Sequence, residues 1–137
     1  MTAALYRNIQ ASLRMYFSGK YSLGTWYIDR KNENMTEDSF IELQTSMGRA
    51  QDDRKAYQYD FTQLLIHSKS VSTLDIIIGT LTAAIEGSGA ISVMDYVGEE
   101  PTSKLGDLQI TRYELSQQST ISNYAVRAIT VYYEFIE

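Results

Sequence analysis

The sequence predicts a single α+β domain, in which two helices pack on one face of a mostly antiparallel, twisted sheet of about six strands. Three observations lead to this fold class. The stretch from Tyr57 to Glu86 changes from the two-residue period of a strand to the 3.6-residue period of a helix. The N-terminal residues have the pattern of an amphipathic helix. Elsewhere, alternating apolar and polar runs are separated by polar or glycine-containing segments typical of turns.

The change of period is clearest on either side of the segment 67–72. Residues 57–66 are rich in aromatic and aliphatic side chains and are predicted to form a strand. Ser72 and Asp75 have the spacing of a capping box, so a helix is expected to begin there. Gly87 is expected to end it, because glycine tolerates the left-handed conformation common after helices. The apolar stripe of this helix consists of Leu74, Ile77, Ile78, Leu81 and Ile85.

The N-terminal segment from Thr2 to Phe17 is predicted to be a helix, with Thr2 as its N-cap and Gly19 as its C-cap. Two arginines on its polar side do not make a strongly basic face, so we expect it to dock on the protein's own sheet rather than on a membrane. Its apolar face comprises Leu5, Tyr6, Ile9, Leu13, Tyr16 and Phe17, and its polar face comprises Arg7, Gln10 and Arg14.

Five further runs are predicted to be strands. Residues 39–47 alternate, which favours one buried and one solvated face. Residues 124–136 are largely apolar on both faces, which indicates a central strand covered on both sides or a strand at a subunit contact. Residues 98–106, which contain the single proline, are predicted to be a loop, and residues 116–123 a polar turn. The five runs are 21–30, 39–47, 90–97, 107–117 and 124–136.

Composition narrows the function classes. The 137 residues contain no domain linker or internal repeat, so residues 1–137 are expected to form one domain. The absence of cysteine excludes disulfides and thiolate metal sites, and a single histidine weakens a zinc site. The net charge of -5 and the lack of a basic run argue against a general nucleic-acid binder. No secretory signal and no apolar stretch long enough to cross a bilayer is visible, so no membrane partner is expected.

The sequence gives little evidence for catalytic residues. His67 lies between the predicted strand and helix, and its chemistry suits a catalytic or pH-sensing role, but the pattern favours a histidine at the edge of a loop. The acid pairs Asp52–Asp53 and Glu99–Glu100 have the chemistry for calcium binding or acid–base work. Adjacent acids point in different directions on an extended chain, so both pairs are expected to be solvated. We therefore predict no catalytic residue, no metal and no cofactor.

Tyrosine is abundant, with 11 residues, and most of them are expected to lie in strands. Tyrosine-rich strands also suit a nucleic-acid stacking platform, which the acidic composition argues against. They suit a small-molecule pocket in a dimeric barrel or a wide surface between subunits, and the sequence leaves these two alternatives open.

The whole pattern resembles the tail terminator, or tail completion, proteins of long-tailed bacteriophages. The resemblance rests on a short N-terminal helix, a long hairpin with a charged loop, and the run YQYDFTQLLIHSKSVSTLDIIIGTLTAAIE. It also rests on the closing run GDLQITRYELSQQSTISNYAVRAITVYYEFIE. It covers most of the chain, but it is a pattern of elements and spacings without a chemical motif. The loop at residues 98–106 and the high tyrosine content do not match the family.

The resemblance implies a structural virion protein without enzymatic activity. Six copies would form a ring that caps the tail tube, stops its polymerisation and joins it to a head-completion or neck protein, and this ring would assemble in the host cytoplasm. DNA would pass through the ring without specific binding, which an acidic lining would favour. We expect the interface residues in two exposed segments, a charged loop and a proline-containing loop. They are Arg49, Asp52, Asp53, Arg54, Lys55, Glu99 and Glu100.

Two other classes remain open. One is a different tail or neck component, such as a tube or connector protein, which would form open-ended tubes instead of closed rings. The other is a small dimeric α+β protein that binds a ligand, in a pocket lined by strand tyrosines, or carries out modest acid–base chemistry.

Overall fold

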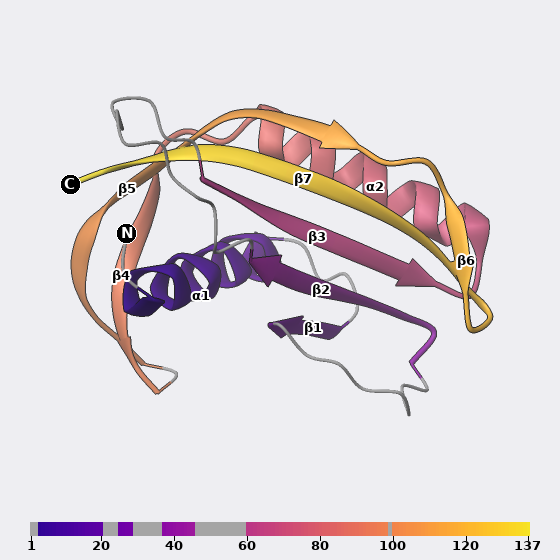
Figure 1. Ribbon diagram of the computed structural model, residues 1–137, viewed down its shortest axis with the longest axis horizontal. Coiled ribbons are helices and arrows are strands. Elements are labelled where there is room, and N and C mark those ends of the chain that lie inside the picture. The colour runs from indigo at the N-terminus through magenta and orange to yellow at the C-terminus, as the bar shows by residue number, and fades with distance from the viewer. Residues whose placement is uncertain (1–2, 21–24, 29–36, 46–59, 99) are drawn as a thin grey trace.

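The computed structural model describes residues 3–20, 25–28, 37–45, 60–98 and 100–137 (Figure 1). Its elements are α1 (Ala3–Lys20), β1 (Thr25–Ile28), β2 (Ser39–Thr45), β3 (Asp60–Ser68), α2 (Val71–Glu86), β4 (Ile91–Val97), β5 (Glu100–Leu115), β6 (Ser119–Ile121) and β7 (Tyr124–Ile136). The parts of the predicted strands at 21–24, 29–30, 46–47 and 57–59 lie outside the described residues, as does the predicted N-cap Thr2.

The predicted fold class is confirmed: two helices accompany a mostly antiparallel, curled sheet. The strand order is β1-β2-β3-β7-β5-β4, and the short β6 pairs with β7 (Figure 1). Only β1 and β2 run parallel among the described strands. β6 was not expected, because it lies in the predicted polar turn at 116–123. Its pairing with the start of β7 supplies the backbone hydrogen bonds that its own weak pattern does not predict.

The main core lies between one face of the sheet and both helices. Ile9, Leu13 and Phe17 of α1 join the apolar stripe predicted for α2 and the buried side chains of the strands in one cluster. Burial of these apolar side chains is the main stabilising contribution to the fold. The predicted apolar faces of the two helices are thus confirmed at these positions.

β7 is the central strand, as one of the two sequence alternatives predicted. Its neighbours are β3 on one side and β5 and β6 on the other. Ile129, Val131 and Tyr133 face the main core, while Tyr124 and Val126 belong to a second, smaller cluster. The alternation of side chains along a strand places this smaller cluster on the opposite face, away from the helices.

The prediction of a solvated face on residues 39–47 is wrong at Phe40 and Glu42. Both side chains are buried, with 5% and 9% of their surface exposed. Phe40 packs edge-on against Tyr124, with ring centroids 5.2 Å apart. Phe40 also stacks on His67 of β3, so its cover comes from two other strands, of which β7 lies more than 80 positions later in the sequence.

The ends of the helices differ from the predicted ones. The N-cap of α2 is Ser70, whose hydroxyl accepts a hydrogen bond from the backbone of Thr73, and not Ser72. Gly87 is the C-cap, as predicted, but its φ of -94° is not left-handed. Gly19 lies inside α1, which continues to Lys20, so its predicted role as a C-cap is wrong.

The loop predicted at residues 98–106 is also wrong. Residues 100–106 belong to β5, which pairs with β4 in a hairpin that has two register shifts; Glu99 lies outside the described residues. Gly98 makes the turn with a φ of 67°, a conformation that glycine adopts without steric cost. Pro101 is accommodated next to the turn and beside one of the irregular positions, where a missing N–H group disturbs the pairing least.

Candidate assembly surface

The predicted interface residues lie almost wholly outside the described part of the chain. This holds for the charged loop, Arg49, Asp52, Asp53, Arg54 and Lys55, and for Glu99. Glu100 is described: it is the exposed first residue of β5, paired with Val97 across the hairpin. Val97 is itself 68% exposed. The tip of this hairpin therefore offers both an acidic and an apolar side chain to a neighbour.

Helix α1 covers the edge of the sheet formed by β4. The hydroxyl of Ser12 accepts a hydrogen bond of 3.0 Å from the backbone N–H of Met94. The side-chain oxygen of Asn8 accepts another of 3.0 Å from the backbone N–H of Tyr96. These side chains take the place of a neighbouring strand, so this stretch of the edge is not open to strand pairing with another molecule.

A second edge lies along β5 beyond Leu108. The first residue of β4, Ile91, lies opposite Leu108, so β4 does not extend past this point. Among the described strands, residues 109–115 therefore pair with β7 alone. The side chains of Leu115 and, further along the same side of β7, Ile121 are 41% and 53% exposed. Within the described part of the chain, this stretch of sheet therefore combines a strand edge without a pairing partner with exposed apolar side chains, which is a feature of interaction edges.

Each helix also turns an accessible face away from the core. On α2, Ile76 is 65% exposed and is accompanied by exposed Gly79 and Ala83. On α1, Met15 is 49% exposed and lies near half-buried Ala11. Such faces of small and apolar side chains allow close approach of another surface. These faces were not predicted, because the helical period of apolar residues indicates only the buried side of each helix.

The histidine that was predicted to lie at a loop edge is instead buried in β3. His67 is 8% exposed, and its ring stacks on Phe40 with centroids 4.1 Å apart and an interplanar angle of 11°. Its Nε2 lies 3.8 Å from Oε1 of Glu42. Burial lowers the pKa of His67, and backbone groups of Leu65 and Phe40 act in the opposite direction. Near neutral pH the imidazole is therefore uncharged and acts as an aromatic packing group.

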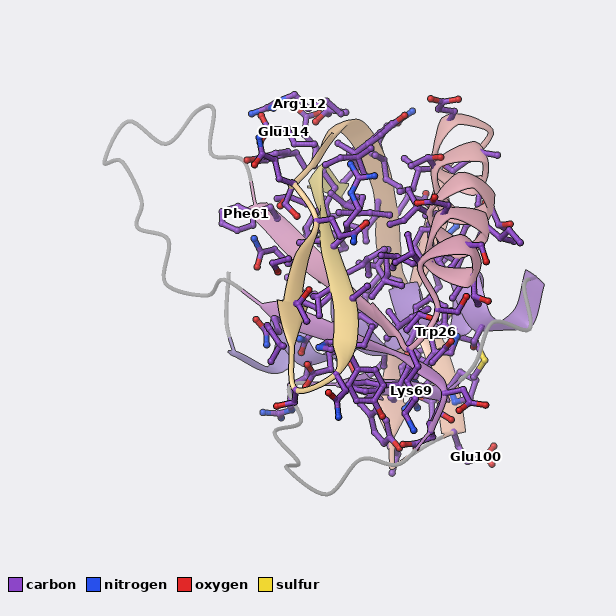
Figure 2. All side chains as sticks on the ribbon, turned by 90° about the vertical axis from the view of Figure 1, so that its right-hand side faces the viewer. Trp26, Phe61, Lys69, Glu100, Arg112 and Glu114 are labelled. Atoms are coloured by element: carbon purple, nitrogen blue, oxygen red, sulfur yellow. The ribbon has the colours of Figure 1, made fainter. Side chains whose placement is uncertain are left out.

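A charged and aromatic cluster lies on the side of the sheet away from α2, where Figure 2 shows Arg112, Glu114 and Phe61. Arg112 donates a 2.6 Å hydrogen bond to Glu114, and its guanidinium carbon lies 3.8 Å from the ring centroid of Tyr132. Tyr132 packs against Phe61 at 5.4 Å. The hydrogen bond raises the pKa of Arg112 and lowers the pKa of Glu114. Because Arg112 and Glu114 are exposed, their ion pair adds little to the stability of the fold. The cluster is a polar patch on the surface.

The described residues contain no group of three or more histidine, cysteine, aspartate or glutamate side chains placed to hold a metal ion. Neither described helix has the length and apolarity needed to cross a membrane. What the described residues present is a set of surfaces: an open strand edge, a hairpin tip, a polar aromatic cluster and two helix faces.

Comparison with known proteins gives a likeness in fold alone. No protein-family model and no curated protein matches the chain. Four solved chains resemble it in structure. One of them, whose name states no function, superimposes over 100% of this chain and 97% of its own length, with a TM-score of 0.57 and 9% sequence identity. This domain architecture therefore occurs in another protein of nearly the same extent.

Proposed function

We propose that this protein is a structural virion component, the tail terminator of a long-tailed bacteriophage. Six copies form a ring on the end of the tail tube, stop the polymerisation of the tube and join it to a head-completion or neck protein. The ring assembles in the host cytoplasm and stays in the virion. The protein has no catalytic role in this proposal.

The observation that supports the proposal most is the arrangement of three of the elements on which the sequence resemblance rests. β3 is joined through Lys69 and Ser70 to α2, and β7 pairs with β3 along nine residue pairs. α2 packs over β3 and β7. The segments that resemble terminator proteins thus form one continuous unit, which serves as a rigid platform for surfaces that meet neighbouring subunits.

The surfaces described above suit assembly into a ring. A closed ring requires two different surfaces on each subunit, because every copy meets one neighbour on each side. This protein has several distinct exposed surfaces on different elements. Its net charge of -5 is also consistent with a channel through which DNA passes, since negative charge repels the phosphates.

The proposal is tested by assembly on tail tubes. The purified protein is first examined by light scattering over a range of concentrations and by electron microscopy. It is then added to growing tubes of the tail tube protein from the phage genome that encodes it. We expect rings at tube ends and an end to tube growth. Continued growth, or copolymerisation of the protein along the tube, would contradict the proposal and favour a tube protein.

The predicted charged loop supplies a second test. Reversal of charge at Asp53 or Arg54, by Asp53→Lys or Arg54→Glu, is expected to weaken assembly and leave the fold of the monomer intact. Glu137→Lys, at an exposed position, is a control for Asp53→Lys, because both substitutions change the net charge by the same amount and in the same direction. Normal assembly of both loop variants would show that this loop is a solvated hairpin tip without a role in subunit contact.

A further inference from the structure

The two helices carry opposite charges, in sequence and in space. The first 28 residues contain Arg7, Arg14 and Lys20 and no acidic residue. The segment between Lys69 and Lys104 contains no basic residue, and its acids include Asp75 and Glu86 of α2. Every formal charge on α1 is therefore positive and every one on α2 negative. Among the described residues, no ion pair joins Arg7, Arg14 or Asp75 to a group of opposite charge.

The charges lie beside the exposed small and apolar residues of each helix. At about 100° per residue, Arg7 and Arg14 lie on one flank of the outward face of α1, next to Ala11 and Met15. The same geometry applied to α2 places Asp75 and Glu86 on one flank of its outward face, next to Ile76, Gly79 and Ala83. Each helix thus combines a strip that permits close packing with a charged flank.

We propose that the outward face of α1 packs against the outward face of α2 of a second copy of this chain. Charge selects this pairing over the two alternatives. Two α2 faces would bring four carboxylates together, and two α1 faces would bring four arginines together, and like charges at a contact are unfavourable. Where α1 and α2 of one copy contact two different neighbours, the same contact repeats from copy to copy and forms a closed ring if the rotation between copies allows it. The inference rests on the proposed ring and names the contact that builds it.

The side on which the charges lie also fixes the direction of the helices. Viewed from outside with the N-terminus down, both charged flanks fall on the same side of the small-residue strip. When two such faces are placed together, the flanks coincide only if the helices run antiparallel. This arrangement sets Arg14 near Asp75 and Arg7 near Glu86, whose carboxylate also accepts a 2.5 Å hydrogen bond from the hydroxyl of Tyr113 in the same copy. The arginines are about 10 Å apart along their helix and the acids about 16 Å, a difference that the long arginine side chains can span.

Cysteine cross-linking tests the contact directly, because the chain has no cysteine of its own. Ala11→Cys places a thiol on the α1 face and Ala83→Cys on the α2 face. Under oxidation at high protein concentration, we expect a disulfide-linked dimer when the two variants are mixed and little from either alone. Ser119→Cys on exposed β6 replaces Ala83→Cys in the control mixture. Equal yield in the control mixture, or a higher yield from one variant alone, would overturn the proposal.

Charge exchange provides a second, independent test. Arg7→Glu with Arg14→Glu makes both helix faces of a chain acidic, and Asp75→Lys with Glu86→Lys makes both basic. Each variant alone is expected to self-associate about tenfold more weakly than the wild type. An equimolar mixture restores association, since every acidic face then meets a basic one in alternating order. Thermal melts of each variant separate a loss of contact from a loss of fold. Failure of the mixture to recover would contradict the proposed pairing.

The outcomes separate this inference from the proposed function. If the wild type forms rings on tail tubes and the mixture does not recover, the ring uses another surface and the terminator proposal stands. A chain with both Ala11→Cys and Ala83→Cys is expected to give a ladder of covalent multimers that ends at the ring size. If the ladder continues without end and no rings are observed, the helix contact stands and the terminator proposal fails.

Discussion

The close approach of β5 and β7 at Gly106 gives a sharp prediction about the fold. A Cβ atom added at this position would lie 2.5 Å from the backbone oxygen of Ile136 and 2.8 Å from Cζ of Phe135. The Phe135 ring can rotate away, but the backbone oxygen can move only if β7 is displaced from β5. Gly106→Ala is therefore expected to force β5 and β7 apart at this position, which lies beside a register shift in the pairing of β4 with β5.

The size of the effect follows from two opposing contributions. Overpacking of this kind destabilises a protein by about 1–3 kcal/mol. Replacement of glycine by alanine also reduces the conformational entropy of the unfolded chain, which stabilises the folded state by about 0.4–1 kcal/mol. We expect a net loss of about 1–2 kcal/mol in the free energy of unfolding. At roughly 4 °C per kcal/mol for a chain of this length, the melting temperature falls by about 4–8 °C.

Urea unfolding followed by circular dichroism measures this loss, with Gly89→Ala as the matched control. A Cβ at Gly89 meets no atom within 4 Å, so the same substitution there should leave the stability unchanged or slightly raise it. Equal stability of the two variants would refute the close packing of β5 against the end of β7.

Further substitutions test the core and the buried polar groups. Leu81→Ala removes a fully buried side chain of α2 and should cost about 2–5 kcal/mol of stability in the same unfolding experiment; a loss below 1 kcal/mol would place α2 outside the core. Tyr133→Phe leaves the buried hydroxyl of Thr62 without its 2.9 Å hydrogen bond and should cost about 1–3 kcal/mol, whereas an unchanged midpoint would contradict this contact. The folded-state pKa of His67 is below its ordinary value of 6.5, so stability from the neutral imidazole is fully present above that pH and is lost as the pH falls through the lowered pKa. His67→Phe should flatten this part of the stability–pH curve, and an unchanged slope would show that another group titrates.

The fold could be predicted where the pattern is local. The change from a two-residue to a 3.6-residue period between residues 57 and 86 is set by neighbouring side chains, and β3 and α2 appear there. The burial of Phe40 depends on Tyr124 and His67 from other strands, which no local pattern contains. The strand at residues 100–106 was missed for the same reason, since its pairing with β4 overrides the turn preference of Pro101.

The candidate assembly surface was predicted only in part. The charged loop at 49–55 was chosen because charged connections tend to be exposed, and it lies outside the described residues. The separation of positive charge on α1 from negative charge on α2 is present in the sequence. Whether these charges lie on a surface that a second copy can contact depends on which side of each helix is exposed. Those sides are known only when the packing of both helices is known.

The most direct test of the proposed function is the size and shape of the assembly that forms on tail tubes. Six copies of the 15.6 kDa chain correspond to about 94 kDa. The account predicts closed six-membered rings at the ends of tubes, visible by electron microscopy, and tubes that no longer lengthen once capped. A stable dimer that encloses a ligand and leaves tube growth unaffected would contradict it and favour a small ligand-binding protein.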